Sequence, residues 1–538
     1  MQPVLNVEDV RRVEQDLTAA GVSLAELMRR AGHAAAQEVL NLGDVEHVII
    51  FAGPGNNGGD SWVAAELLHR AGASVEVVCS EDPAEIQSPL EAMVAKSAQE
   101  AGVSYVVAPS KNDIERRLQE ASVALDGIFG TGFHGEIHAP YDIWINAINE
   151  SGIKVVSIDV PSGISAQTGE GANPYVMAEV TVTMISLKPG LISGKGRDAC
   201  GAIVVAPLAE QSEKFIVDAD PVAWRVDTAD YVDVIPAPTV DIDKYSRGSV
   251  LVVAGSKHYP GAAILAAEAA ARAGAGYVTL CVPSCIATVC RTHLTSIPVV
   301  ALPSSDSGTF AISAKADLIK LAKSRDVVVA GPGMGVSADT VSLVTALLET
   351  KVPLVLDADA LNSMARMTTD SIDNFPELIR REAPLVLTPH RKELGRLVGM
   401  NDAPPESLAS SMEAARRIVW ADGGSDICVI AKGEATACVG VEIALLPKPG
   451  PLSLATAGTG DILAGIVGAF LARHMNEEDV LPLMCAMACE THATAARLAA
   501  EEFGLYGALS SDIVKKVGLA LDNVEERTTL LAATEMDS

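Results

Sequence analysis

The segment HVIIFAGPGNNGGDSWVAAELLHRAG, residues 47–72, sets the fold class of the N-terminal half. Its apolar, largely β-branched start predicts a buried strand, and a glycine-rich turn then leads into a helical pattern. Another apolar run, SVEVVCS, begins at residue 74. A strand, a helix and a second strand in this order predict a βαβ unit and therefore a parallel sheet.

The same rhythm extends along most of the chain, with one interruption. It continues through the runs at 123–130, 154–163 and 202–209, and then gives way to a stretch rich in Pro and Asp. We place a domain boundary there, near residues 218–240. Alternation restarts with SVLVVAGS at 249–256 and predicts a second parallel sheet. The two halves share no evident repeat, so we expect two different α/β domains.

Composition limits the classes of function. A chain of 538 residues is too long for one ordinary domain, which implies at least two cores. With 40 basic and 69 acidic residues the formal net charge is −29, so the basic surface that nucleic acid or an anionic membrane requires is missing. A phosphate ligand must therefore be held locally, by backbone amides, a helix N-terminus, a metal ion or a single placed lysine.

Cysteine usage and the N-terminal residues predict a cytoplasmic protein. Nine cysteines are scattered without a CxxC pair, mostly in apolar runs, as expected for buried thiols in a reducing compartment. Cys485 and Cys489 lie one helical turn apart, but no second pair completes a zinc site. The first residues are polar and lack the apolar core of a signal peptide, and no apolar run is long enough to span a bilayer.

The glycine-rich turn at residues 53–60 has two interpretations. Its amides and the start of the following helix form a phosphate site, as in dinucleotide-binding folds, or Asn57 or Asp60 simply caps the helix. The spacing is not GxGxxG, and Glu76 matches the acidic ribose contact only loosely. An ordinary NAD dehydrogenase is therefore disfavoured.

Two further strand ends combine polar residues with glycines. ALDGIFGTGFHG, residues 124–135, has Asp126 before a glycine-rich loop, and VVSIDVPSGI, residues 155–164, has Asp159 and Ser162 after a strand. Ligands of open α/β sheets bind at the carboxyl ends of strands, so these loops are expected to share one crevice. The motifs NNGGD, DGIFGTGFHGE and DVPSG in this order resemble the epimerase domain of the NAD(P)H-hydrate repair enzymes, over roughly residues 1–215.

This resemblance implies a Rossmann-like domain, assigned to residues 1–217, that interconverts the R and S forms of hydrated NADH or NADPH. It implies a K⁺ ion held by Asn57, Asp126 and Ser162, and oxygen ligands of this kind suit a hard, weakly held cation. It also makes Asp159 the expected catalytic residue. The expected contacts to the hydrate are Asn56, Asn57, Gly58, Gly59, Asp60, Gly130, Thr131, Gly132, Phe133, His134, Gly135, Glu136 and Asp159.

Two residues of this half stand apart from the resemblance. Ser61 occupies a position where the family usually has glycine, and its hydroxymethyl group puts the fit of the substrate at the helix start in question. Lys188, in the segment SLKPG, is expected at the surface or at a strand end and receives no role.

The second half contains ATAGTGDILAG, residues 455–465. Gly458, Thr459 and Gly460 precede a predicted helix, so their amides and the helix dipole form an anion site with Asp461 at its mouth. A carboxylate there can take a proton from a substrate hydroxyl while the amides stabilise a transferring phosphoryl group. The alternative is an ordinary helix N-cap, which Thr or Asp often provides.

Three more loops follow predicted strands in this half: GPGMG at 331–335, LTPHRKE at 387–393 and KGEAT at 432–436. His390 is either a capped loop histidine or a ligand contact. Asp357 and Asp359 of DADAL belong either to a solvated turn or to a magnesium–phosphate site.

These motifs resemble the ribokinase-like dehydratase half of the same repair enzymes, and we assign that domain to residues 225–538. The resemblance implies Asp461 as the catalytic base, with Ala262, Gly333, His390 and Asp461 contacting the hydrate. The implied nucleotide contacts are Lys432, Gly433, Glu434, Ala435, Thr436, Gly458, Thr459 and Gly460. Arg391 and Lys392 replace the usual Pro-Gly after the histidine, and Ala457 replaces a glycine. Extra charge near the substrate phosphates and a thicker wall are the expected consequences.

The sequence thus predicts an N-terminal Rossmann-like parallel-sheet domain followed by a ribokinase-like α/β domain. The expected function is epimerisation of R- and S-NAD(P)HX and dehydration of the S form, with ADP or ATP as co-substrate and Mg²⁺ and K⁺ as ions. A cytoplasmic homo-oligomer that binds neither nucleic acid nor membrane is expected. The alternative is a vitamin or sugar kinase fused to a non-catalytic Rossmann-like binding module.

Overall fold

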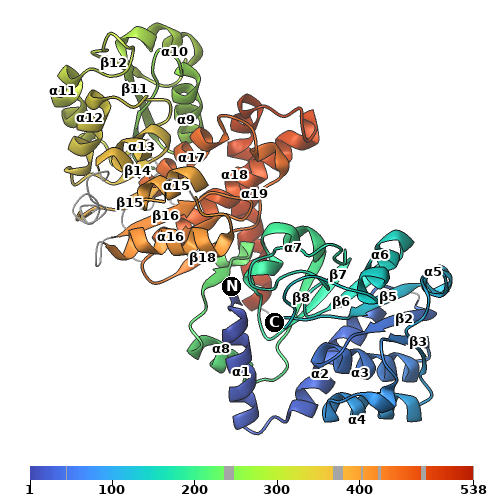
Figure 1. Cartoon of the computed structure of the whole chain (residues 1–538). Helices are drawn as coiled ribbons and strands as arrows, with labels where there is room; N and C mark the ends of the chain where they lie inside the picture. The colour runs from blue at the N-terminus through green and yellow to red at the C-terminus, as the bar shows by residue number, and fades with distance from the viewer. Residues whose placement is uncertain are drawn as a thin grey trace. The chain divides into compact units, whose positions relative to one another are not determined.

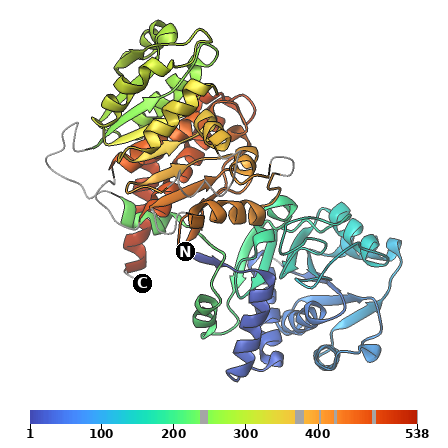
Figure 2. The same ribbon diagram turned by 60° about the vertical axis from the view of Figure 1, so that its left-hand side comes forward.

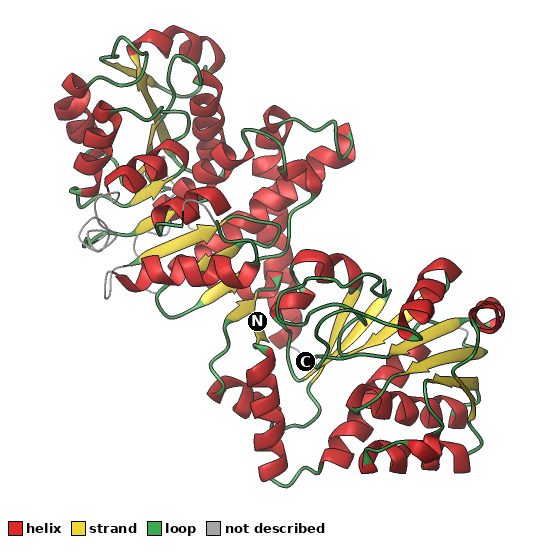
Figure 3. Ribbon diagram, in the orientation of Figure 1, coloured by secondary structure: helices red, strands yellow, loops and turns green. Residues whose placement is uncertain are grey.

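The computed structural model describes residues 1–43, 45–235, 247–367, 380–400, 404–421, 426–473 and 480–536. The chain divides into an N-terminal unit, Gln2–Ala223, and a C-terminal unit from Trp224 onward. Residues 236–240 of the boundary region predicted from sequence lie outside the described residues. In both units strands alternate with helices (Figure 3), so the predicted α/β class is confirmed.

The N-terminal unit is built on a seven-stranded sheet in the order β4-β3-β2-β5-β6-β7-β8, and all of its strand pairs are parallel. The order reverses between β2 and β5, which makes this the switch point of the sheet. The strands are β2 (His47–Ala52), β3 (Ser74–Cys79), β4 (Ser104–Val107), β5 (Val123–Gly127), β6 (Lys154–Ile158), β7 (Val180–Met184) and β8 (Ala202–Ala206).

Helices cover both faces of this sheet (Figure 1). Along β2, Val48 and Ile50 belong to a core shared with α1, α2 and α3, whereas Ile49 and Phe51 pack in a second core with α5 and α6. This alternation is what a strand buried on both faces requires. The helices are α1 (Val7–Ala19), α2 (Leu24–Asn41), α3 (Asn56–Arg70), α4 (Pro89–Glu100), α5 (Lys111–Glu120), α6 (Tyr141–Ser151), α7 (Gly194–Ala199) and α8 (Ser212–Asp218), and a short strand β1 (Gln2–Val4) precedes them.

The sheet of the C-terminal unit follows the order β9-β18-β17-β16-β15-β14-β13-β10-β11-β12. Its pairs are parallel from β16 to β12, and the β16–β17 and β17–β18 pairs are antiparallel. The strands are β9 (Ala223–Arg225), β10 (Ser249–Val253), β11 (Tyr277–Pro283), β12 (Val299–Leu302), β13 (Val327–Ala330), β14 (Leu354–Leu356), β15 (Leu385–Leu387), β16 (Ile427–Ala431), β17 (Ala437–Val439) and β18 (Ala444–Leu446).

Close packing of α9 (Pro260–Arg272) against α17 (Thr459–Arg473) fixes the start of α17 in this unit (Figures 1 and 2). Gly465 permits the approach, because a Cβ there would lie 2.2 Å from the carbonyl oxygen of Ala266. The remaining helices are α10 (Ala287–His293), α11 (Lys315–Ala322), α12 (Ala338–Leu348), α13 (Ala358–Met367), α15 (Arg391–Leu397), α16 (Leu408–Ala421), α18 (Leu481–Phe503) and α19 (Ser510–Met536). No helix among the described residues is long and apolar enough to cross a membrane.

Candidate active sites

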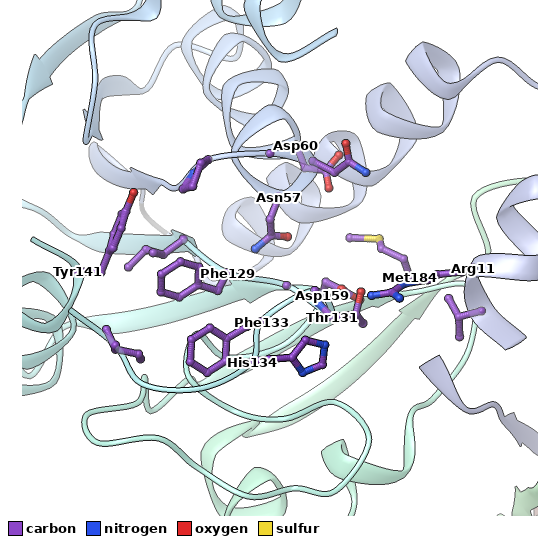
Figure 4. Close-up of a pocket in the computed structure, with 18 of the residues that line it drawn as sticks. Arg11, Asn57, Asp60, Phe129, Thr131, Phe133, His134, Tyr141, Asp159 and Met184 are labelled. Atoms are coloured by element: carbon purple, nitrogen blue, oxygen red, sulfur yellow. Dashed lines mark hydrogen bonds between the residues drawn. The ribbon is translucent and has the colours of Figure 1, made fainter. Parts of the chain in front are cut away.

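The N-terminal unit contains a cavity of about 660 Å³ at the carboxyl ends of β2, β5 and β6 (Figure 4). This is the switch point of the sheet, where open α/β folds bind ligands. The start of α3 forms one wall, and the loops after β5 and β6 form the opposite wall. Most of the contacts predicted from sequence line this cavity: Asn56, Asn57, Asp60, Gly130, Thr131, Gly132, Phe133, His134, Glu136 and Asp159.

The glycine-rich turn is shaped by close backbone packing. A Cβ at Gly58 would lie 1.8 Å from the carbonyl oxygen of Gly53, and one at Gly59 would lie 2.5 Å from Cε of Met28. These two glycines therefore serve packing and do not line the cavity. The N-cap of α3 is Gly55, without a side-chain capping bond, so the alternative that Asn57 or Asp60 caps this helix is wrong.

The departure at Ser61 does not disturb the turn. Its side chain is buried, and its hydroxyl donates to the carbonyl oxygen of Asn57 over 2.9 Å. The space comes from Gly127, because a Cβ on that residue would lie 1.8 Å from Oγ of Ser61. The crowding expected at the helix start is thus absorbed by the neighbouring strand, away from the cavity.

Asp126 is fully buried at the end of β5 and accepts four hydrogen bonds. The hydroxyl of Ser157 and the amide of Ser162 donate to Oδ2 over 2.9 Å each, and Oδ1 accepts from the hydroxyl of Ser162 over 2.5 Å and from the amide of Ile128 over 3.3 Å. Burial raises the pKa of the carboxyl, and these donors oppose that effect. Asn57 is also buried, and its Nδ2 has no hydrogen-bond partner.

Asp159 follows β6 with φ of 65°, a left-handed conformation that is uncommon for a residue other than glycine. One carboxylate oxygen accepts the amide of Thr131 over 3.0 Å, and the other accepts Nζ of Lys188 over 2.7 Å. Burial would raise the pKa of Asp159, but the ammonium of Lys188 and these hydrogen bonds outweigh it and lower the pKa. Asp159 is therefore held as a carboxylate at the cavity wall.

The expectation that Lys188 lies at the surface or a strand end without a role is wrong. Its side chain is fully buried, and its ammonium also donates to Oγ1 of Thr183 over 2.7 Å and to the carbonyl oxygen of Met184 over 2.8 Å. A buried lysine is stable only when it is paired and hydrogen-bonded in this way. No motif marked this residue, because its partner Asp159 lies 29 positions earlier in the chain.

Two other carboxylates of the cavity differ from Asp159. Burial is the main cause that raises the pKa of Asp60 and of Glu14, and the charge of Asp159 raises both further. Glu14 and Arg11 reach the cavity from α1, which the sequence prediction had not connected with the site. The sequence of α1 carries only an amphipathic pattern, which gives no sign of a role in the cavity.

In the C-terminal unit, Asp461 is the third residue of α17 and thus lies inside the helix, after the N-cap position. The hydroxyl of Thr459 donates to the carbonyl oxygens of Leu454 and Thr456, over 2.8 and 2.9 Å. Gly458 has φ of 93°, which favours glycine at this turn. The structure therefore does not support the simple N-cap interpretation of GTGD.

The surroundings of Asp461 raise its pKa to about 7. Burial is the largest cause, the charge of Asp357 acts in the same direction, and Lys432 opposes both. Lys432 forms an ion pair of 2.9 Å with Asp357, whose Oδ1 also accepts the hydroxyl of Thr388 over 2.7 Å. A Cβ at Gly460 would lie 3.3 Å from Nζ of Lys432, so the lysine lies directly beside the start of α17.

The other residues predicted for this site differ in burial and in the neighbours they contact. Asp357 is buried, so the interpretation of DADAL as a solvated turn is wrong for this residue, and Asp359 accepts the amide of Gly335 over 2.8 Å. A Cβ at Gly333 would lie 3.0 Å from Cβ of Ala262, which brings these two predicted contacts together. In the Lys432–Thr436 loop, Gly433 and Glu434 are exposed, and Ala435 and Thr436 are partly buried.

His390 is the N-cap of α15, as a loop histidine at a helix start would be, and its predicted contact with the hydrate stays a prediction. Its Nδ1 accepts the amides of Lys392 and Glu393 over 3.1 and 3.4 Å, which requires Nδ1 to carry no proton. Burial and then the charge of Lys432 lower its pKa. The guanidinium of Arg391 lies over Gly433, where a Cβ would be 3.4 Å from Nε, and Ala457 is exposed.

Neither the cysteines nor any cluster of possible metal ligands forms a further site among the described residues. All nine cysteines are free, and all except Cys285 are buried, as predicted. Sγ of Cys438 lies 4.0 Å from that of Cys489. The described residues contain no group of three or more His, Cys, Asp or Glu side chains that could hold a metal ion.

Comparison with known proteins gives matches over nearly the whole chain. Residues 24–190 match the family model described as YjeF-related protein N-terminus, and residues 250–518 match that described as NAD(P)H-hydrate dehydratase. The bifunctional NAD(P)H-hydrate repair enzyme Nnr of Coxiella burnetii is 32% identical, covering 94% of this chain and 96% of the relative. The protein of the same name from Escherichia coli is 30% identical, with coverages of 94% and 91%.

Solved structures each match part of the chain. The ADP/ATP-dependent NAD(P)H-hydrate dehydratase of Bacillus subtilis, co-crystallised with ATP/Mg²⁺, is 24% identical with a TM-score of 0.43, covering 55% of this chain and 94% of that one. The yeast protein ynu0, YNL200c, is 25% identical with a TM-score of 0.33, covering 35% of this chain and 82% of that one.

Proposed function

The chain belongs to the family of bifunctional NAD(P)H-hydrate repair enzymes, and on this premise we propose that residues 1–217 form the epimerase and residues 225–538 the dehydratase. The protein interconverts R- and S-NAD(P)HX and dehydrates S-NAD(P)HX to NAD(P)H at the expense of ADP or ATP. Because the similarity to a bifunctional repair enzyme extends over nearly the whole chain, we reject the alternative of a kinase fused to a non-catalytic module.

The epimerase proposal rests on the contrast between the carboxylates of the N-terminal cavity. Inversion at C6, which carries both the hydroxyl and the ring nitrogen, requires a bond at C6 to open and re-form. Removal of the hydroxyl proton opens the C6–N1 bond to an aldehyde as the ring nitrogen takes up a proton, and reclosure on the other face with return of both protons gives the epimer. Asp159 is suited to removing the hydroxyl proton, because Lys188 keeps it ionised at the cavity wall. Epimerisation supplies the S form to the dehydratase, which otherwise leaves the R form unused.

Potassium fits the residues near this cavity. Asn57 and Ser162 offer neutral oxygens and Asp126 offers one carboxylate, so the set carries a single buried negative charge that a monovalent cation neutralises. The unpaired Nδ2 of Asn57 indicates that its amide is not oriented by a protein partner. When bound, the ion supplies charge neutralisation for Asp126 and links the loops that carry these residues.

We therefore predict a monovalent ion in the epimerase site. Crystals grown with K⁺ and exchanged into Tl⁺ should show one strong anomalous peak within coordination distance of Asn57, Asp126 and Ser162. A peak at the zinc absorption edge in the same place would contradict the assignment, because the site offers no nitrogen or sulfur ligand of the kind zinc prefers.

The exchange Asp126→Ala should abolish most epimerisation and leave dehydration of pure S-NADHX close to the wild-type rate. The change leaves four buried donors without their acceptor, which disturbs the loops after β5 and β6. Asp126→Asn, which keeps the volume, is the matched variant. Equal loss of both activities in a folded protein would count against two separate sites.

The dehydratase proposal rests on the position of Asp461. Its carboxylate removes the proton of the C6 hydroxyl, and the oxygen then attacks the terminal phosphoryl group of the nucleotide. The first amides of α17 and the ammonium of Lys432 stabilise the charge that develops on that group. The phosphate ester then loses phosphate as the ring nitrogen donates electrons toward C6 and C5 gives up a proton, which restores the dihydropyridine.

Magnesium fits next to this arrangement in the manner typical of nucleotide enzymes. Mg²⁺ is usually held by one or two carboxylates together with substrate phosphates, so the absence of a larger cluster among the described residues is no obstacle. Asp357 and Asp359 are the carboxylates that would hold it, and it would supply charge neutralisation for the nucleotide phosphates. We further propose a cytoplasmic homo-oligomer.

The choice of nucleotide has a direct test. Purified protein is incubated with S-NADHX and either ADP or ATP, while reduced nicotinamide is followed by its absorbance and the nucleotide products by chromatography. We propose ADP as the working donor, with AMP and phosphate as products. Formation of a stable phosphorylated hydrate, without recovery of NADH, would contradict the dehydratase assignment.

A further inference from the structure

Helix α1 contributes to the epimerase cavity although it lies outside the residues that match the family model, 24–190. Val10, Arg11 and Glu14 line one side of the cavity. Figure 4 shows Arg11 extending toward the end where Asp159 and Thr131 lie. The first turns of the chain thus complete a wall that α3 and the two loops leave open.

Arg11 forms no hydrogen bond or ion pair among the described residues, although the chain carries a large excess of acidic side chains, and its charge is one of those that oppose the raised pKa of Glu14. Its neighbour Arg12 differs in this respect. Arg12 donates to Oδ1 of Asp9 over 2.6 Å and to the carbonyl oxygen of Ala219 over 3.1 Å. Of these two adjacent arginines, Arg12 is occupied by protein acceptors and Arg11 is not, so Arg11 is available to a ligand.

Arg11 is also the one lysine or arginine among the residues that line the cavity. The lining includes four carboxylic acids, Glu14, Asp60, Glu136 and Asp159. Lys188 is close by, but its ammonium already donates to three acceptors and is fully buried. A phosphate group that enters this cavity therefore meets a single cationic side chain able to bind it.

We propose that Arg11 binds the phosphate groups of the hydrated dinucleotide in the epimerase site, an inference that rests on the epimerase function proposed above. A guanidinium presents two parallel N–H donors that match two phosphate oxygens, and it stays charged at every working pH. Arg11 is thus a substrate-binding residue that sets affinity for phosphorylated substrates. The unphosphorylated part of the substrate is recognised by the rest of the cavity.

The experiment compares Arg11→Gln with the matched control Arg12→Gln in the full chain. For NADHX, Arg11→Gln should raise the KM of epimerisation about tenfold and change kcat little, as expected for loss of one charged hydrogen bond on the substrate. Arg11→Lys should restore part of the loss. Hydrated reduced nicotinamide riboside, which has no phosphate, should show the same KM with Arg11→Gln and with wild type.

The dehydratase activity of the same chain reports on folding, and it should be unchanged by Arg11→Gln. A wild-type KM for NADHX in this variant would overturn the inference, as would an equal rise for the riboside, or a fall in kcat with an altered pH profile. The last result would mean that Arg11 acts on the cavity carboxylates. Failure of the wild-type protein to epimerise NADHX would instead contradict the epimerase assignment itself. The role of Arg11 and the epimerase function can therefore fail separately.

Discussion

Replacing Asp461 by asparagine should lower the rate of dehydration of S-NADHX by about 10²–10⁴, the usual cost of losing general-base catalysis. Asparagine keeps the size of the side chain and its place in the first turn of α17, but it cannot accept the hydroxyl proton. Nucleotide binding and epimerisation should persist. Single-turnover measurements with pure S-NADHX and ADP check the loss.

The pH profile provides a second signature of the same residue. Asp461 must be ionised to act as a base, and its pKa is about 7, so the wild-type rate should rise as the pH increases through about 7. Because this pKa is raised on folding, ionisation of Asp461 weakens the folded state progressively above the ordinary pKa of an aspartate and fully above pH 7. Asp461→Asn should therefore be at least as stable as wild type at pH 8.

These outcomes distinguish catalysis from folding. A variant that dehydrates at a near wild-type rate would show that Asp461 has only a structural role in the helix. A variant that is inactive because its melting temperature has collapsed would contradict the expectation that it is at least as stable as wild type at pH 8.

The exchange Lys188→Met should reduce epimerisation by about 10² or more, although Lys188 itself acts through Asp159. Removing one partner of a buried ion pair typically costs about 3–5 kcal/mol, because the other charge is left without compensation. Asp159 would respond by binding a proton, and its pKa would rise. The epimerase would then lose its ionised base at neutral pH.

A pH profile separates this positioning role from a merely structural one. In Lys188→Met the acidic limb of kcat/KM for epimerisation should move to higher pH, so that activity recovers partly in alkaline buffer. Thr183→Val, which removes one other acceptor of the same ammonium, is the milder control and should leave the limb near its wild-type position. If the acidic limb does not move and epimerisation is slower by the same factor at every pH, Lys188 does not act through the ionisation of Asp159. Dehydratase activity again reports on folding.

Local patterns in the sequence predicted the fold because the strands are short, apolar and separated by turn residues. The run at 47–52 is β2, and the glycine-rich turn leads into α3 as expected. The ends of β2, β5 and β6 meet at the switch point, which is a consequence of parallel topology alone. Residues Asn57, Asp126, Asp159 and Asp461 could therefore be found from their places at strand ends and helix starts.

Such local patterns could not predict ion pairs between residues that are far apart in the sequence. Lys188 pairs with Asp159 across 29 positions, and Lys432 pairs with Asp357 across 75 positions. Neither spacing has a meaning within one element, so only the folded sheet brings the charges together. Arg11 was missed for the same reason, because an exposed arginine on an amphipathic helix has no signature until the helix closes a cavity wall.

A complementation assay tests whether one chain carries two independent active sites. Asp159→Asn and Asp461→Asn chains are each incubated with an equal mixture of R- and S-NADHX and excess ADP, then mixed, and the final yield of NADH is compared with wild type and with a control without protein. Asp159→Asn alone should stop after the S form is consumed, Asp461→Asn alone should give no NADH, and the mixture should convert both epimers completely. If the mixture yields no more NADH than Asp159→Asn alone, the two activities do not reside in separable sites, and the account is wrong.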